Sequence, residues 1–146
     1  MDDIVKAALK KWPNVPHCYG WLALDARGDW YLRDEPTQAA GPFPHIKGSR
    51  IEHAKLKEFI HRNYDRDERG AWFFQNGPQR VYVQLEAAPL ILGVQRHDDG
   101  RFEVTTHTGD VVSETGPSWV DEHGRLFLQT PKGLGLMRSL DMDVAA

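Results

Sequence analysis

Three four-residue segments with a shared pattern recur along this chain, each starting with a polar residue and ending with glycine. They are Asp25–Gly28, His97–Gly100 and Asp121–Gly124, and strand-forming residues flank each of them. Aspartate suits the first position of a type I turn, and glycine in the fourth adopts the left-handed conformation that reverses the chain as a bulged hairpin. The turns therefore predict β-hairpins and a sheet-rich fold.

Alternating apolar and polar residues extend the sheet prediction along the chain. They favour antiparallel pairing, because sheets with one wet face show this alternation. A further turn at Thr130–Gly133, with proline second and glycine fourth, returns the chain into a last strand. Predicted strands lie within residues 19–33, 71–74, 79–85, 90–96, 101–105, 111–112, 119–120, 126–128 and 134–137. The expected arrangement is a mostly antiparallel meander, as a sandwich or a partly open barrel.

Two segments have the apolar spacing of short amphipathic helices. Residues 3–12 begin with acidic residues, end with two lysines and are followed by Pro13, which are helix boundary signals. Ser49–Glu52 has the form of a capping box and predicts a helix over residues 50–64. Prolines and glycines in residues 34–48 predict a loop. The sequence therefore predicts an α+β fold with two short helices packed on the sheet.

The length of 146 residues predicts one globular domain over residues 1–146. Within it we expect an N-terminal helix and arm over residues 1–16 and a mobile tail over residues 139–146. Turn glycines at positions 77, 100 and 124 recur at spacings of 23 and 24 residues. Hairpins alone produce that spacing and the flanking sequences do not align in detail, so a repeat or propeller is not expected.

Charge and cysteine content limit the classes of partner and compartment. The net charge is −3 and the isoelectric point is near 6.1, so we do not expect nucleic-acid binding, although residues 47–62 form a local basic segment. The single cysteine, Cys18, excludes an internal disulfide and favours a reducing compartment. An acidic N-terminus and the lack of a long apolar run argue against a secretory signal or membrane span. We expect a cytoplasmic protein.

Motifs with known chemistry fail at the positions that matter. His53 and His61 lie eight residues apart on the predicted helix, too far to share a metal ion. Asp65–Gly70 resembles the start of a calcium loop, but Arg69 and Asn76 replace required oxygen ligands, and we interpret the segment as a polar helix terminus. No catalytic residues, cofactor or metal are therefore predicted.

Five residues remain as candidates for a pocket assembled only on folding: His17, Cys18, His45, Arg80 and His107. Adjacent strand residues point to opposite faces, so His17 is badly placed to activate Cys18. Aromatic residues beside arginine, in Trp72–Phe74 and Arg80–Tyr82, could form a stacking platform, although burial in a core is the stronger interpretation.

Abundant aromatic residues without a catalytic constellation favour a binding or protein-interaction module that lacks catalytic activity. Self-association, as a homodimer through an apolar strand face or sheet edge, is the expected mode. The alternative is a small enzyme or small-molecule-binding protein that uses a pocket built from the five candidates.

The run Glu68–Val81, which follows the predicted capped helix, resembles small bacterial proteins grouped as a domain of unknown function. The resemblance covers most of the chain. It implies a compact bacterial domain with no established activity, and it assigns no functional residue.

Overall fold

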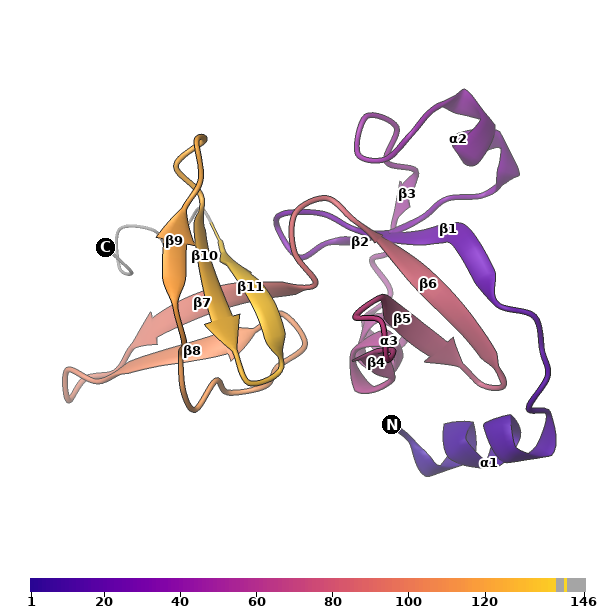
Figure 1. Cartoon of the computed structure of the whole chain (residues 1–146), viewed down its shortest axis with the longest axis horizontal. Helices are drawn as coiled ribbons and strands as arrows, with labels where there is room; N and C mark the ends of the chain where they lie inside the picture. Colours follow the sequence, from indigo (N-terminus) through magenta and orange to yellow (C-terminus); the bar gives the residue numbers. More distant parts are fainter. Residues whose placement is uncertain (139–140, 142–146) are drawn as a thin grey trace. The chain divides into compact units, whose positions relative to one another are not determined.

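The computed structural model describes residues 1–138 and Asp141, which form two compact units. Unit 1 comprises residues 1–25 and 29–86, and unit 2 comprises residues 26–28 and the chain from residue 87 onward. Each unit contains one β-sheet (Figure 1). Apart from Asp141, the expected tail over residues 139–146 lies outside the described residues. The single domain over residues 1–146 stays a prediction.

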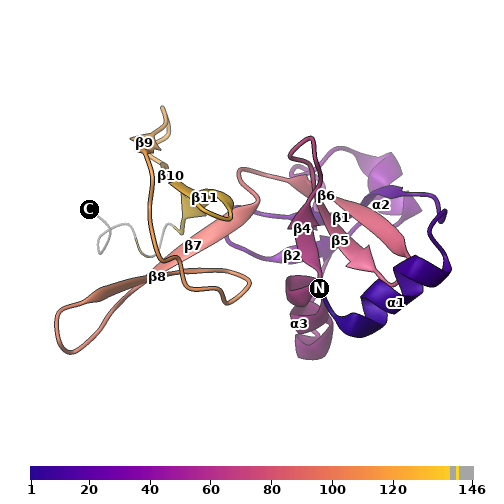
Figure 2. The same cartoon turned by 60° about the horizontal axis from the view of Figure 1, so that its bottom comes forward.

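Unit 1 combines a six-stranded sheet with short helices. The helices are α1 (Asp3–Lys11), α2 (Glu35–Ala40) and α3 (Ala54–Arg62). The strands are β1 (Cys18–Leu24), β2 (Trp30–Leu32), β3 (Ser49–Arg50), β4 (Tyr64–Arg66), β5 (Trp72–Asn76) and β6 (Gln79–Leu85). Their order across the sheet is β3-β2-β1-β6-β5-β4, and only β1 and β6, at the centre, run parallel. Figures 1 and 2 both place α1 beside the turn that joins β5 to β6.

Unit 2 contains a five-stranded sheet. Its strands are β7 (Leu90–Arg96), β8 (Phe102–Thr106), β9 (Ser118–Val120), β10 (Leu126–Thr130) and β11 (Gly133–Met137). They follow the order β8-β7-β11-β10-β9, and only β7 and β11 run parallel. The hairpins predicted at Gly28, Gly100 and Gly124 are confirmed, since each glycine has a positive φ between two antiparallel strands.

The predicted α+β class with mostly antiparallel sheets is confirmed. Two pairings depart from a simple meander, because β1 with β6 and β7 with β11 run parallel. Each sheet ends in two edge strands, so neither closes into a barrel among the described residues. The residues of a turn determine that the two strands on either side of it pair, but they do not determine which hairpins then pair with each other.

Apart from the additional edge strand β3, the two sheets share one topology. In each, an antiparallel hairpin comes first (β1–β2 or β7–β8), and a trio of antiparallel strands follows (β4–β5–β6 or β9–β10–β11). The last strand of the trio pairs in parallel with the first strand of the hairpin. This structural repeat is of another kind than the one suggested by the 23- and 24-residue glycine spacing, and it was not predicted from the sequence.

The trios also align in sequence when Tyr64 is placed on Ser118. The first two strands then coincide in length, and the third strands, β6 and β11, begin at the same position but span seven and five residues. Five positions between 67–75 and 121–129 are then identical. They are Asp67/Asp121, Glu68/Glu122, Gly70/Gly124, Phe73/Phe127 and Gln75/Gln129. These residues serve the turn and the strand that follows it, which both units need.

Three local predictions in unit 1 need correction. Residues 34–48 are not all loop, because Asp34 caps α2 by accepting a hydrogen bond from the Thr37 N–H. Ser49 begins strand β3 instead of a helix, and α3 is capped four residues later by His53, whose Nδ1 accepts from the Leu56 N–H. Asp65–Gly70 is no helix terminus: it ends β4 and forms the turn into β5. The helix expected at residues 3–12 is confirmed.

One face of the sheet in unit 1 is covered by α3. The Phe59 ring of α3 meets the Phe74 ring of β5 edge-on, with centroids 5.6 Å apart. Trp30, which is fully buried, contacts Tyr64 and donates its indole N–H to Nε2 of His61 at 2.9 Å. Because successive strand residues alternate between faces, residues next to Phe74 in sequence point to the opposite face.

Acid is expected to destabilise unit 1 through His61. Burial, and to a lesser degree the charge of Lys57, lowers the pKa of His61. The folded state therefore binds this proton less readily than the unfolded chain, so the free energy of unfolding falls as the pH drops below about 6.5. Urea unfolding at about pH 7.5 and about pH 5.5 measures the loss, which should shrink in His61→Gln. An unchanged loss in this variant would contradict the assignment.

Candidate functional site

An open groove of about 570 Å³ lies on unit 1. Phe73 of β5 and Tyr82 of β6 face each other in register, on the sheet face opposite Phe74. The groove is lined by Met1, His17, Tyr19, Asp65, Arg66, Asp67, Glu68, Arg69, Phe73, Arg80 and Tyr82. It is therefore built from residues of four neighbouring strands and the segments that flank them.

Aromatic rings cluster around Tyr82. Tyr19 stacks on Tyr82 with a centroid separation of 5.0 Å and an interplanar angle of 4°. His17 and Phe73 approach the same ring at steeper angles, with centroids 5.6 and 6.0 Å away. Phe73 is buried, Tyr82 is half-buried and Tyr19 is 64% exposed. The cluster thus runs from the core to an exposed aromatic ring at the surface.

An irregularity in β1 brings Tyr19 to this cluster. Cys18 pairs with Val81 and Leu22 pairs with Val83, so β1 advances by four residues while β6 advances by two, which makes a bulge in β1. Gly20 lies inside this bulge with φ +84°, and a Cβ there would come within 2.7 Å of the Gln38 side chain. Bulges redirect side chains and occur often beside binding sites.

Arg80 contributes a cationic group to the groove. Its guanidinium carbon lies 3.9 Å from the centroid of the Phe73 ring, a cation–π contact. Among the described residues, none accepts a hydrogen bond from the guanidinium of Arg66, Arg69 or Arg80. Arg80 is half-buried whereas Arg66 and Arg69 are exposed, so water can satisfy fewer of the hydrogen-bond donors of Arg80 than of the other two.

Asp67 joins the groove to the turn between β4 and β5. Oδ1 accepts hydrogen bonds from the backbone N–H groups of Arg69 and Ala71, and Oδ2 accepts from the hydroxyl of Tyr82 at 2.7 Å. The Tyr82 hydroxyl, followed by the Ala71 N–H, lowers the pKa of Asp67. The carboxylate is therefore ionised at neutral pH and fixes the Tyr82 side chain.

The repeat separates scaffold residues from residues peculiar to the groove. Asp121 holds its turn through the same backbone contacts as Asp67, but its Oδ2 pairs with Arg125 instead of a tyrosine. The counterparts of Arg80 and Tyr82 in unit 2 are Leu134 and Leu136. Arg80 and Tyr82 are thus not required by the topology that the two units share.

Of the five candidates from the sequence, the structure brings His17 and Arg80 together in the groove. Cys18 pairs with Val81 and does not line it, and burial raises the pKa of its thiol, which disfavours the reactive thiolate. His45 is exposed on the segment after α2. His107 belongs to unit 2, where its Nδ1 accepts from the Ile91 N–H.

Tyr19, Phe73 and Tyr82 were missed as site residues by the sequence reasoning. Phe73 and Tyr82 belong to the segments that form a possible stacking platform in the sequence, for which burial in a core is the stronger interpretation. That interpretation fits Phe73, whereas Tyr82 is half-buried. Tyr19 belongs to the first predicted hairpin and carries no such signal. Exposure of Tyr19 depends on the bulge, whose local signal in the sequence is a single glycine, Gly20, within the strand.

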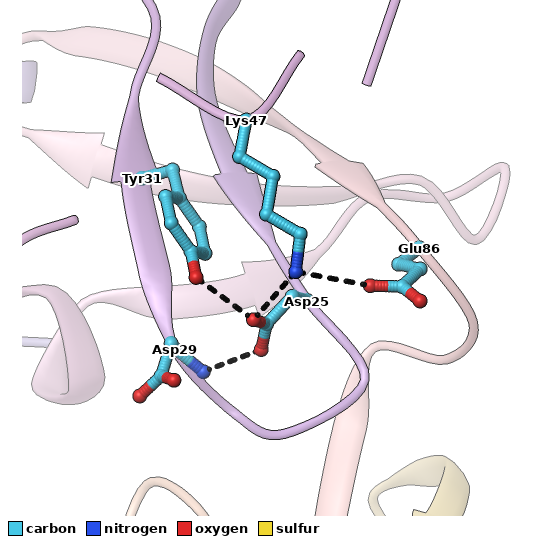
Figure 3. A network of polar contacts seen from close by, with 5 residues as sticks. All are labelled: Asp25, Asp29, Tyr31, Lys47 and Glu86. Carbon is cyan, nitrogen blue, oxygen red and sulfur yellow. Dashed lines mark hydrogen bonds and ion pairs between the residues drawn. The ribbon is translucent and has the colours of Figure 1, made fainter. Parts of the chain in front are cut away.

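A second polar cluster in unit 1 surrounds Asp25, whose side chain is 1% exposed (Figure 3). Its carboxylate accepts from the Asp29 N–H, the Tyr31 hydroxyl and Lys47 Nζ, at 2.9, 3.0 and 3.2 Å. Lys47 also lies 3.8 Å from Glu86. Burial, with the Asp25 hydrogen bond second, raises the pKa of Tyr31 to about 12. These contacts tie residue 47 to the sheet and leave the carboxylate occupied.

Buried Arg33 makes a similar attachment to the segment that precedes Lys47. Its guanidinium donates to the carbonyl oxygens of Gly41 and Ile46, at 2.6 and 3.2 Å, and to the side chain of Gln84. Both polar clusters therefore hold the chain between α2 and β3 in place, and we assign them a structural role.

Residues 1–138 and Asp141 contain no group of three histidine, cysteine, aspartate or glutamate side chains that could hold a metal ion. No helix within the same part of the chain has the length and apolar character needed to cross a bilayer.

Comparisons with known proteins identify a family without an assigned activity. Residues 1–146 match the family described as "Protein of unknown function (DUF2946)". No curated protein matches the sequence.

Two solved structures resemble the chain in fold. A DUF1285 family protein from Shewanella baltica OS155 is 18% identical, with a TM-score of 0.55 over 86% of this chain and 90% of that one. A DUF1285 family protein from Silicibacter pomeroyi DSS-3 is 13% identical, with a TM-score of 0.59 over 99% of this chain and 83% of that one. At these identities the likeness concerns the fold alone.

Proposed function

The chain belongs to this family of proteins of unknown function, as the resemblance in residues 68–81 implied, and we propose that it is a cytoplasmic binding module without catalytic activity. Its ligand occupies the groove around Tyr19, Arg80 and Tyr82. The observation that carries the proposal is the bulge in β1, which places an exposed tyrosine ring on the aromatic cluster of the groove.

The chemistry of the groove supports binding over catalysis. Cys18, the strongest nucleophile among the candidates, does not line the groove, and the hydroxyl of Tyr82 is committed to Asp67. His17 is exposed, and within the described residues its ring contact is with Tyr82. Enzymes that use a nucleophile hold it within hydrogen-bond reach of a base, and these residues do not form such a pair.

A small enzyme is the second candidate function, because His17 and Arg80 line one groove. A histidine beside an arginine can supply a general base and a positive charge to a bound anion. The two functions separate by the fate of the ligand, which a binding module returns unchanged and an enzyme converts.

A fragment screen followed by NMR tests the proposal. We expect planar compounds to shift the amide signals of residues 17–21, 66–70 and 80–83 and to be recovered unaltered. Tyr19→Ala should weaken their binding at least about fivefold, because it removes a stacking partner. Phe102→Ala, which removes a similarly exposed ring from unit 2, is the matched control. Equal binding by Tyr19→Ala, or ligands that shift other residues only, would refute this site.

Compartment and assembly form the remaining part of the proposal. The single cysteine fits the reducing cytoplasm. Trp119 and Val120 are exposed on edge strand β9, which offers apolar surface and free backbone groups for self-association, and we place a homodimer contact there. Light scattering on the screened samples reports this state.

Nucleic acid is not included among the proposed partners. Three of the five lysine and arginine residues of the basic segment 47–62 are paired within the fold: Lys47 with Asp25, Arg50 with Glu52, and Arg62 with Asp2. Together with the net charge of −3, these pairs weaken the attraction of the segment for a phosphate backbone.

A further inference from the structure

We propose that the ligand of the groove is a small aromatic anion, whose ring stacks on Tyr19 and whose carboxylate or phosphate group binds the guanidinium of Arg80. This inference rests on the proposed function and names the chemical class of its ligand. It combines two features of the groove: an exposed stacking surface, and a cation whose hydrogen bonds no described residue accepts.

The stacking surface is the outer face of Tyr19. The inner face lies nearly parallel to Tyr82, with centroids 5.0 Å apart, while 64% of the residue remains exposed. An aromatic ligand placed on the outer face would extend this stack by one ring. Offset stacking of this kind adds to the benefit of burying the ring. A solvent-exposed tyrosine held in a fixed orientation loses little further freedom when the ligand binds.

The cationic feature is Arg80. Phe73 supports one face of the guanidinium, which limits its motion, and no described residue accepts its hydrogen bonds. A rigid fork of N–H donors matches the paired oxygens of a carboxylate or phosphate. The carboxylate of Asp67 is the one whose pKa the charge of Arg80 helps to lower, but the two side chains form no ion pair. The donors of Arg80 thus stay available.

Other charges at the groove are of both signs. Arg66 and Arg69 add positive charge without acceptors among the described residues, whereas Asp65 and Glu68 add negative charge at exposed positions. Exposed charges are largely screened by solvent, so half-buried Arg80 dominates ligand recognition. The volume of about 570 Å³ suits a compound of one or two rings.

Four probes separate the parts of this inference: benzoate, phenyl phosphate, the neutral benzamide, and inorganic phosphate. We expect at least one aromatic anion to bind in the groove at least about tenfold more tightly than benzamide and than inorganic phosphate. NMR titration of the full chain measures each dissociation constant and locates the site. Benzoate and phenyl phosphate distinguish a carboxylate ligand from a phosphate ligand.

Variants assign the preference to Arg80. Arg80→Met should remove the advantage of the anion over benzamide, and Arg80→Lys should keep only part of it, because lysine lacks the planar fork. Arg125→Met is the matched control, since Arg125 lies over Phe127, the counterpart of Phe73, but is already paired with Asp121. Thermal unfolding checks that each variant folds.

Different results would refute the ligand class and the groove as a binding site. Equal binding of benzamide and the anions in the groove, or an anion preference that survives Arg80→Met, would refute the ligand class while leaving the groove as a binding site. If none of the four probes binds in the groove, the aromatic anion is refuted, and the fragment screen alone then decides whether the groove binds anything.

Discussion

Asp25→Ala is expected to lower the free energy of unfolding by about 3 kcal/mol. The carboxylate is buried and accepts hydrogen bonds from the Asp29 N–H, the Tyr31 hydroxyl and Lys47. Removing the carboxylate deprives these donors of an acceptor in a site largely closed to water, although Lys47 still lies 3.8 Å from Glu86. Lys47 is 39% exposed and can recover part of its hydration, which keeps the loss below that of a fully buried pair.

Urea unfolding monitored by circular dichroism measures this loss. Asp25→Asn retains the shape and one acceptor oxygen, so a smaller loss is expected, and the difference reports the contribution of the charge. Asp99→Ala makes the same chemical change in the equivalent hairpin of unit 2, where the carboxylate is 54% exposed, and should cost far less. If Asp25→Ala and Asp99→Ala proved equally stable, the cluster in Figure 3 would have no structural role.

Gly48→Ala is expected to lower the free energy of unfolding by about 3 kcal/mol, through two separate effects. Gly48 has φ +98°, a conformation that side chains disfavour, and a Cβ at this position would overlap the carbonyl oxygen of Leu32. Backbone cannot move aside as a flexible side chain could. The strain would displace residue 47 and weaken its contact with Asp25.

Gly70→Ala provides the control for backbone conformation alone. Gly70 has φ +82° but no atom within 4 Å of the added Cβ, so only the conformational cost of about 1 kcal/mol should remain. Chemical unfolding of both variants separates this cost from the steric one. Combining Gly48→Ala with Asp25→Ala should give less than the sum of the two losses, because both disturb the Lys47 contact. Equal losses in the two glycine variants would argue against the steric contribution.

The local part of the fold could be predicted from sequence because turn chemistry is local. Glycine at positions 28, 100 and 124 takes a positive φ in hairpins, as expected. Where local signals compete, the outcome depends on strand pairing. Ser49 and Glu52 resemble a helix cap, but Ser49 and Arg50 instead form β3, which pairs with β2. The helix then begins after this strand.

The repeat was missed for a related reason. Glycine spacing compared turns of different kinds, whereas the true correspondence links the turn ending at Gly70 with the turn ending at Gly124. The sequences agree where both units need the same backbone, and they diverge at Arg80/Leu134 and Tyr82/Leu136. Those divergent positions are also where the groove differs from the rest of the scaffold.

The groove could be foreseen only in fragments. His17 and Arg80 were named among five candidates, but their meeting depends on the parallel pairing of β1 with β6. Sequence separation hides such pairing, and the bulge that turns Tyr19 toward Tyr82 has no marker beyond a glycine within a strand.

The parallel centre of each sheet also has a consequence for how the chain acquires its structure. In unit 1, Cys18 must find Val81, and in unit 2, Leu90 must find Gly135, so the central seam of each sheet joins segments that leave the ribosome far apart in time. Closing such long loops is entropically costly and slows folding relative to hairpin formation. A nascent chain that has emerged only through β5 can form the hairpins on either side of the sheet, but it lacks β6, which pairs with both β1 and β5. The stack of Tyr19 on Tyr82 therefore cannot form before β6 is made.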